Sequence, residues 1–270
     1  MQMMFSNILA IYRKELQSYF ASPLAYTVAG VFWLIAGIFF AGILFGDQGL
    51  IGQASSSDLR AQQFGFTPFP IDVPYTFLQF FLGTLGSLVL FILPVLSMGL
   101  YAEERKRGTL ELLATSPITN WMVAIGKLLG VVTFFLTMLL PLLIYEAIVF
   151  NASNPPFNFT TVLVAHLGLL LLAAAILSLG MFVSSLTDST ILAAVFTFAL
   201  VLLLWGIDLV AKSVGGVVGD ALGHLSLLKH YTNLVQGVLD TGSLVLFASY
   251  IVLGVFLTAQ SIEALRFQRS

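Results

Sequence analysis

Five consecutive charged residues occupy positions 103–107 of the sequence, directly after a long apolar run. Only 9% of the chain is charged, so this cluster needs a specific reason. Basic residues beside an apolar run fix the side of a membrane on which a loop stays. The next residues, GTLELLATSP, predict a short amphipathic helix, because Gly108 permits a sharp turn, Thr109 can cap a helix and Pro117 ends it. Exposed leucines on such a helix call for a cleft in a partner protein. The alternative is a solvated loop whose charges only fix the topology. This alternative explains the basic residues but leaves the segment GTLELLATSP unexplained.

The motifs of common catalytic sites are absent from this sequence. It contains no G-x-x-x-x-G-K-[ST], no H-E-x-x-H and no G-x-S-x-G. His224 and His230 are six residues apart, so on one helix they would point about 120° away from each other and make a poor metal site. The absence of cysteine excludes thiolate chemistry. We therefore expect no catalytic residue, no bound cofactor and no metal in this chain, and we do not expect an enzyme.

Four ionisable residues interrupt the apolar runs, where such groups are functional candidates. Lys127 and His166 lie near the starts of their runs, and Glu146 and Asp208 lie near the ends of theirs. None falls clearly at the middle of a run, and none has a partner of opposite charge that the sequence makes evident. A proton relay or an ion-coupled carrier therefore has little support.

The composition indicates an integral membrane protein. Hydrophobic residues make up 59% of the 270 residues and the mean hydropathy is +1.00, more apolar surface than a soluble globule can bury. Runs of about 20 apolar residues are long enough to cross the bilayer as helices, and no period-two alternation indicates a barrel. We predict an all-α fold with six spans, at residues 23–45, 74–101, 120–150, 159–186, 189–208 and 243–263. Pro94 and Pro141 lie inside spans and can kink them.

The first 22 residues predict an interfacial helix ahead of the first span. Apolar residues recur at helical spacing between Ile8 and Phe20, while Arg13 and Lys14 face away from them. Glu15 falls on or near the apolar face. Either it reaches out to water or to a neighbouring base, or it contacts another cytoplasmic element.

Two longer segments connect spans on the other side of the membrane. Residues 46–73 are rich in Gly, Ser, Gln and Pro and predict a loop without chemistry, flexible at QASSSD and stiffened by prolines at FTPFPIDVP. Residues 209–242 predict a short helical lid or a re-entrant pair at the outer face, after a glycine-rich break that contains Gly215, Gly216, Gly219 and Gly223. The apolar stripe of this lid consists of Leu227, Leu228, Tyr231, Leu234, Val235 and Val238.

Basic residues predict the orientation. In the six-span arrangement, eight of the 11 Lys and Arg residues share the side of the two termini, and Arg60, Lys212 and Lys229 lie on the other side. The positive-inside rule then places both termini and the charged cluster in the cytoplasm.

Four sequence words carry a resemblance to a known family: YRKELQSYFASPLAY, EERKRGTLELLATSPITNWMVAIGKLLG, GMFVSSLTDS and LSLLKHYTNLVQGVLDTG. The chain resembles the ABC type-2 transporter permeases over nearly all of its length. Within them it is most similar to the gliding-motility and nitrous-oxide-reductase-maturation permeases. The second word is the most specific of the four. The resemblance implies one permease domain over residues 1–270, with an elbow helix, a cytoplasmic coupling helix and extracytoplasmic helices before the last span.

The resemblance also implies partners and contact residues. A separate ABC ATP-binding subunit, which holds ATP and Mg, would grip the coupling helix, and a loop at Thr187 and Asp188 would make a secondary contact. The residues of the implied coupling helix are Gly108, Thr109, Leu110, Glu111, Leu112, Leu113 and Ala114. A second permease copy would complete the complex. Relatives often work with a membrane-anchored extracytoplasmic protein, which makes such an accessory protein a candidate partner.

The function expected on this basis is that of an exporter permease in the bacterial plasma membrane, driven by ATP hydrolysis in another subunit. The alternative is a channel or assembly scaffold that ATP does not drive. A gene for an ATP-binding protein beside this one would favour the first. The transported substrate does not follow from the sequence.

Overall fold

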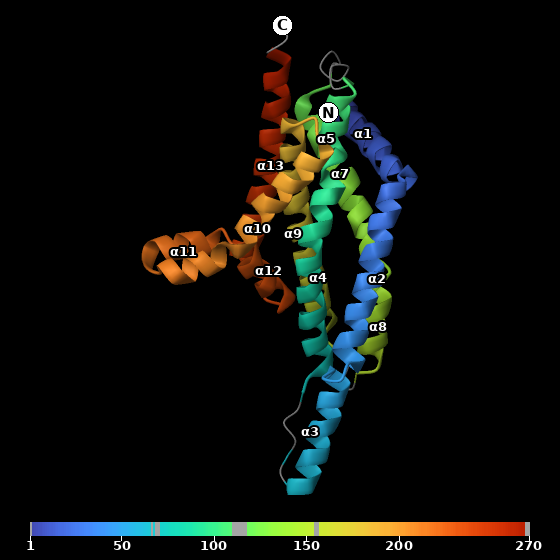
Figure 1. Ribbon diagram of the computed structural model, residues 1–270, viewed down its shortest axis with the longest axis vertical. Coiled ribbons are helices and arrows are strands. Elements are labelled where there is room, and N and C mark those ends of the chain that lie inside the picture. The colour runs from blue at the N-terminus through green and yellow to red at the C-terminus, as the bar shows by residue number, and fades with distance from the viewer. Residues whose placement is uncertain (1, 66, 68–70, 110–117, 154–156, 268–270) are drawn as a thin grey trace.

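The computed structural model describes residues 2–65, 67, 71–109, 118–153 and 157–267, and these residues form an elongated helical bundle (Figure 1). No strand occurs among them. The helices are α1 Gln2–Ala21, α2 Pro23–Phe45, α3 Leu50–Phe64, α4 Val73–Ser97, α5 Gly99–Lys106, α7 Asn120–Leu139, α8 Leu142–Asn151, α9 Phe159–Leu186, α10 Thr190–Val214, α11 Gly216–His224, α12 Leu227–Val235 and α13 Thr241–Phe267.

Among the described residues, six helical segments are long and apolar enough to cross a membrane, as predicted, and the all-α fold class is confirmed. They are Pro23–Phe64, Val73–Lys106, Asn120–Leu139, Phe159–Leu186, Thr190–Val214 and Thr241–Leu265. The predicted third span, residues 120–150, is divided into α7 and α8 at Leu140 and Pro141. Proline has no backbone N–H to donate and its ring crowds the preceding turn, which accounts for the break.

The centre of the bundle is α9, which packs against α4, α7, α10 and α13. Small residues let the neighbouring backbones approach closely, as is common between membrane helices. A Cβ added at Gly180 would meet the Ser97 side chain of α4, and one at Gly254 of α13 would meet the backbone of Ser178 at 2.6 Å. These contacts hold α9 closely against α4 on one side and α13 on another.

The prediction of a loop over residues 46–73 is wrong for its first half, because α3 is a helix of 15 residues. The serines suggested flexibility, but Leu, Ala, Gln and Arg in this segment are good helix formers. Gly65 then ends the helix with a left-handed C-cap (φ 69°), and its N–H bonds the Ala61 carbonyl. In Figure 1, α3 extends beyond the bundle at the end opposite to α5.

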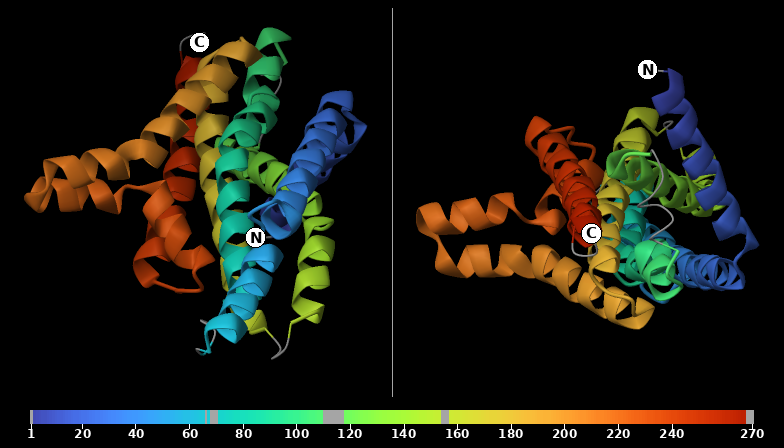
Figure 2. Two further views of the ribbon diagram at one scale, coloured as in Figure 1. Left: turned by 60° about the horizontal axis from the view of Figure 1, so that its bottom comes forward. Right: turned by 90° about the horizontal axis from the view of Figure 1, so that it is seen from above.

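The segment before the last span also differs in detail from the prediction. The fifth span continues to Val214 rather than ending at residue 208. Gly215 and Gly216 have positive φ and form the expected break, whereas Gly219 and Gly223 lie within the helix α11. In all views α11 points away from the bundle and the chain returns through α12 (Figures 1 and 2).

The lid helix is confirmed as α12, although it is shorter than expected. The predicted residues Leu227, Tyr231, Leu234 and Val235 are buried against the bundle. Leu228 is only half-buried, and Val238 lies beyond the end of α12 and is 53% exposed. The missing last turn explains the difference, because the chain leaves the helix at Gln236 and turns at Gly237 (φ 80°).

Candidate functional site

The charged cluster at residues 103–107 forms the last turn of α5 and the residues just after it. Gly108 has φ 71°, and its N–H bonds the carbonyl of Arg105. The N–H of Thr109 bonds the carbonyl of Glu104 at 3.0 Å, which completes a Schellman motif. The Thr109 hydroxyl donates to the same carbonyl. The sharp turn predicted at Gly108 is therefore present, and it fixes the direction in which the chain leaves α5.

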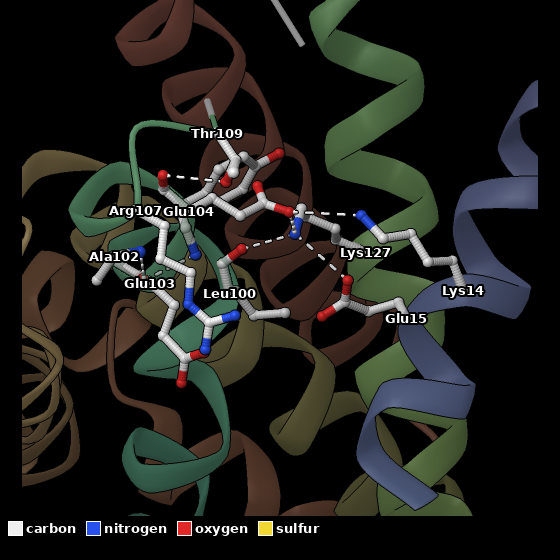
Figure 3. Close-up of polar contacts among 11 residues, drawn as sticks. Lys14, Glu15, Leu100, Ala102, Glu103, Glu104, Arg107, Thr109 and Lys127 are labelled. Atoms are coloured by element: carbon white, nitrogen blue, oxygen red, sulfur yellow. Dashed lines mark hydrogen bonds and ion pairs between the residues drawn. The ribbon is translucent and has the colours of Figure 1, made fainter. Parts of the chain in front are cut away.

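A buried lysine of α7 connects α5 to the amino-terminal helix (Figure 3). Lys127 Nζ donates to Glu104 Oε1 at 3.0 Å, to Glu15 Oε2 at 3.3 Å and to the Leu100 carbonyl at 2.7 Å. An ammonium group has three donors, so all three are satisfied. The Lys127 side chain is 4% exposed, and those of Glu15 and Glu104 are 13% and 19% exposed. We call Lys127, Glu15 and Glu104 the buried ion cluster.

Two further groups complete the surroundings of the buried ion cluster. Lys14 Nζ lies 3.9 Å from Glu104 Oε1, on a side chain that is 76% exposed. The Lys127 ammonium also lies 5.0 Å from the centre of the Tyr101 ring, within the range of a cation–π contact. A charge removed from water is costly unless it is paired and hydrogen-bonded. These contacts explain why Lys127 is directed inward instead of towards water.

Close packing of α1 on α7 brings Glu15 within reach of Lys127. A Cβ added at Gly126 would lie 2.8 Å from Ile11, and one at Gly130 would lie 2.8 Å from the Cβ of Glu15. These glycines form a G-x-x-x-G pair, a pattern that permits close contact between membrane helices. Because Lys127 lies between these two glycines in the segment GKLLG, it lies close to α1.

The beginning of α5 is attached to the end of α9. Ser184 Oγ accepts the N–H groups of Tyr101 and Ala102 at 3.1 and 3.0 Å and donates to the Met98 carbonyl at 2.7 Å. One hydroxyl thus serves backbone groups at the break between α4 and α5. Arg105 Nη1 donates to the Ser185 carbonyl at 2.9 Å.

The predicted contact residues fall in two groups. Gly108 and Thr109 lie at the end of α5, as described above, whereas residues 110–114 lie outside the described residues, so the predicted coupling helix remains a prediction. Thr187 and Asp188 directly follow α9, and the Thr187 hydroxyl accepts the N–H of Ser189. Because Arg105 bonds Ser185, the two predicted contact regions are connected by α5.

The sequence did not reveal the buried ion cluster as a unit. Lys127 was expected to lie near the cytoplasmic end of its span, and Glu15 to lie near an apolar face, but the pairing joins residues 112 positions apart. The glycines of GKLLG were a signal that could have indicated the close helix contact.

A second polar pair lies near the opposite end of the bundle. Glu146 Oε2 of α8 and His166 Nε2 of α9 are 3.4 Å apart, and the Glu146 side chain is 2% exposed. Asp208 pairs with Lys212 one turn later in α10, with 2.6 Å between the charged atoms. Asp208 thus has a partner of opposite charge that the sequence did not make evident, whereas neither carboxyl oxygen of Glu146 has a hydrogen-bond partner among the described residues.

No group of three His, Asp or Glu side chains suited to a metal ion occurs within the described part of the chain. His224 is exposed and His230 is buried, with its Nδ1 2.9 Å from Ser243 Oγ. Burial lowers the pKa of His230 below its usual value. The arrangement around α5 offers charge pairing and attachment to α1, α7 and α9.

The comparison with protein-family models matches residues 52–216 to the family described as ABC-2 family transporter protein. The matched segment runs from α3 into α11 and includes α5, α7 and α9. It covers more than half of the chain. The comparison with curated proteins found no match.

Proposed function

The chain belongs to the ABC-2 family of transporter proteins, and we propose that this multi-pass permease subunit is driven by ATP hydrolysis in a separate subunit. Family membership implies an ABC ATP-binding subunit as its partner. The proposed contact is the segment of residues 108–114, with a secondary contact at Thr187 and Asp188.

The attachment of α5 is the observation that supports this proposal most strongly. Its end leads through a fixed turn into the proposed contact segment, and its sides are tied to α1, α7 and α9 through Glu104, Arg105 and Ser184. A push on the contact segment would therefore reach several helices at once. Closure of an ATP-bound partner can then shift the equilibrium between two arrangements of the bundle.

Direction, orientation and assembly belong to the same proposal. We assign to the chain the export direction, assembly as two permease copies and a location in the bacterial inner membrane. We also assign it to the group of the gliding-motility and nitrous-oxide-reductase-maturation permeases. An extracytoplasmic accessory protein is proposed as a further partner. Among the described residues, α1 begins and α13 ends on the same side of the bundle as α5, which is in keeping with an even number of spans (Figure 1).

The orientation can be tested by cysteine labelling, since the natural chain has no cysteine background. Ser56→Cys lies on the exposed surface of α3, and Ser116→Cys follows the proposed contact segment by two residues in the sequence. An impermeant maleimide should label the first in intact cells and the second only after permeabilisation. Labelling of both positions from one side would overturn the proposed topology.

The coupling role is tested by Glu111→Lys, which places a positive charge where the proposal expects an acid to face the partner. Asp58→Lys makes the same charge change on an exposed position of α3 and serves as the control. The tagged wild-type chain and Asp58→Lys should retain a co-purifying Mg-dependent ATPase, while Glu111→Lys should lose it or leave it hydrolysing ATP without transport. Equal retention and equal transport in all three would favour a channel or scaffold that ATP does not drive.

A further inference from the structure

A cavity of about 440 Å³ lies between α7, α8 and α9, away from the buried ion cluster. Its volume falls within the range of about 300–1,000 Å³ typical of small-molecule sites. Five lining leucines are between 39% and 55% exposed on the side of the bundle, namely Leu136, Leu140, Leu143, Leu163 and Leu167. In a membrane protein such a surface faces lipid, so an apolar molecule can enter the cavity laterally from the bilayer.

Glu146 and His166 are the polar exceptions among the side chains that line this cavity. Glu146 lies five residues before the end of α8 and His166 seven residues after the start of α9. At about 1.5 Å per residue, both are roughly 8–10 Å from those helix ends. The pair therefore lies one to two turns inside the helix ends, where the side chains of Glu146 and His166 are only 2% and 18% exposed.

The Glu146 carboxyl group is buried without the hydrogen bonds it needs. Its residue is 2% exposed, and neither oxygen has a hydrogen-bond partner among the described atoms, although Oε2 lies 3.4 Å from His166 Nε2. An unsatisfied buried carboxyl group is costly, because a carboxylate in water accepts several hydrogen bonds. The site thus lacks donors and positive charge.

The hydrogen bond of His166 shows which of its nitrogens faces the cavity as an acceptor. Nδ1 lies 2.9 Å from the Val162 carbonyl, and a carbonyl can only accept, so Nδ1 carries the proton. In the neutral ring, Nε2 then carries no proton, and its lone pair is directed at the Glu146 carboxyl group. The two side chains together present acceptors to a ligand, which would have to supply donors.

We propose that this cavity binds a hydrophobic amine, with its ammonium group on Glu146 and His166 and its apolar tail among the five leucines. An ammonium group supplies three N–H donors and the missing positive charge. His166 is the only lining residue among those described that can become cationic, so the cavity does not suit the phosphate of a phospholipid. This ligand site goes beyond the proposed ATP-driven role and does not depend on it.

The test uses the full chain in phosphatidylcholine nanodiscs, with dodecylamine as the probe and dodecanol as its uncharged analogue. Thermal unfolding is followed by the fluorescence of the three tryptophans. Dodecylamine should raise the unfolding temperature in a saturable manner and dodecanol should not. Glu146→Gln should increase the half-saturating concentration by at least about tenfold, since it removes a charged hydrogen-bond partner. Asp58→Asn, on the exposed surface of α3, should behave like the wild type.

A second variant leaves Glu146 in place and closes the cavity. Leu163→Trp should abolish the amine effect, because the larger side chain occupies the space of the tail while position 163 is already 55% exposed. An equal effect of dodecanol, or an unchanged amine effect in both Glu146→Gln and Leu163→Trp, would overturn the proposal. Loss of the dodecylamine effect on the wild-type chain when phosphatidylethanolamine replaces phosphatidylcholine in the nanodiscs would show that an aminophospholipid occupies the site, which also contradicts the proposal.

Discussion

Lys127 of α7 and Glu104 of α5 form an ion pair with 3.0 Å between Nζ and Oε1, and Glu15 of α1 shares the same ammonium group. The pair lies next to the turn at Gly108, where the proposed contact segment begins. Because three helices meet at one lysine, they are expected to move together when that segment is displaced.

The first prediction concerns removal of this lysine. Lys127→Met leaves two largely buried carboxylates without their cation, and breaking a buried pair in this way typically costs about 3–5 kcal/mol. We expect a markedly lower unfolding temperature in detergent. The triple variant Lys127→Met, Glu15→Gln, Glu104→Gln removes the unpaired charges and should recover much of the loss. An equally unstable triple variant would show that the charges are not the cause.

The second prediction concerns the glycines beneath α1. Gly126→Ala with Gly130→Ala adds methyl groups where the nearest atoms of α1 lie at 2.8 Å, and overpacking of this kind costs roughly 1–3 kcal/mol. The double variant should be less stable and should separate α1 from α7. Gly30→Ala with Gly42→Ala in α2, where a Cβ meets nothing within 4 Å, is the matched control. Equal unfolding temperatures for the two double variants would contradict the close packing.

The third prediction is a graded series in the lid helix. Leu234 is fully buried, so Leu234→Ala should cost about 2–5 kcal/mol. Leu228→Ala should cost less, because Leu228 is half-buried, and Val238→Ala should have almost no effect at a 53% exposed position. Unfolding temperatures of the three variants give the order directly. Equal effects would mean that α12 does not pack on the bundle as described.

The fourth prediction is a pH dependence that arises from α12. Burial lowers the pKa of His230, while Lys229 and Asp240 nearby act in opposite directions and Ser243 contacts the ring. The unfolded chain therefore binds a proton more readily than the folded one, so stability should fall as the pH decreases below about 6.5. Unfolding temperatures between pH 8 and pH 5 should decrease less in His230→Asn. Parallel curves for the two proteins would contradict this prediction.

The spans could be predicted because length and apolar composition are local properties of a sequence. The turn at Gly108 and four buried residues of the lid also followed from local signals. The helix α3 was not predicted, because its three consecutive serines indicate a flexible loop, whereas the Leu, Ala, Gln and Arg residues around them favour a helix. The buried ion cluster could not be predicted, since the partners of Lys127 come from α1 and α5 and their approach depends on tertiary packing of the glycines in α7.

The central claim is that a separate ATP-binding subunit grips residues 108–114. A photo-crosslinking amino acid at Leu112 tests it most directly, with the same amino acid at Ser56 of α3 as the control. The claim predicts that crosslinking in cells joins Leu112, but not Ser56, to a polypeptide that is itself labelled by a photoreactive ATP analogue. Correctly inserted protein without an ATP-binding crosslink at Leu112, or with the same crosslink at Ser56, would contradict it.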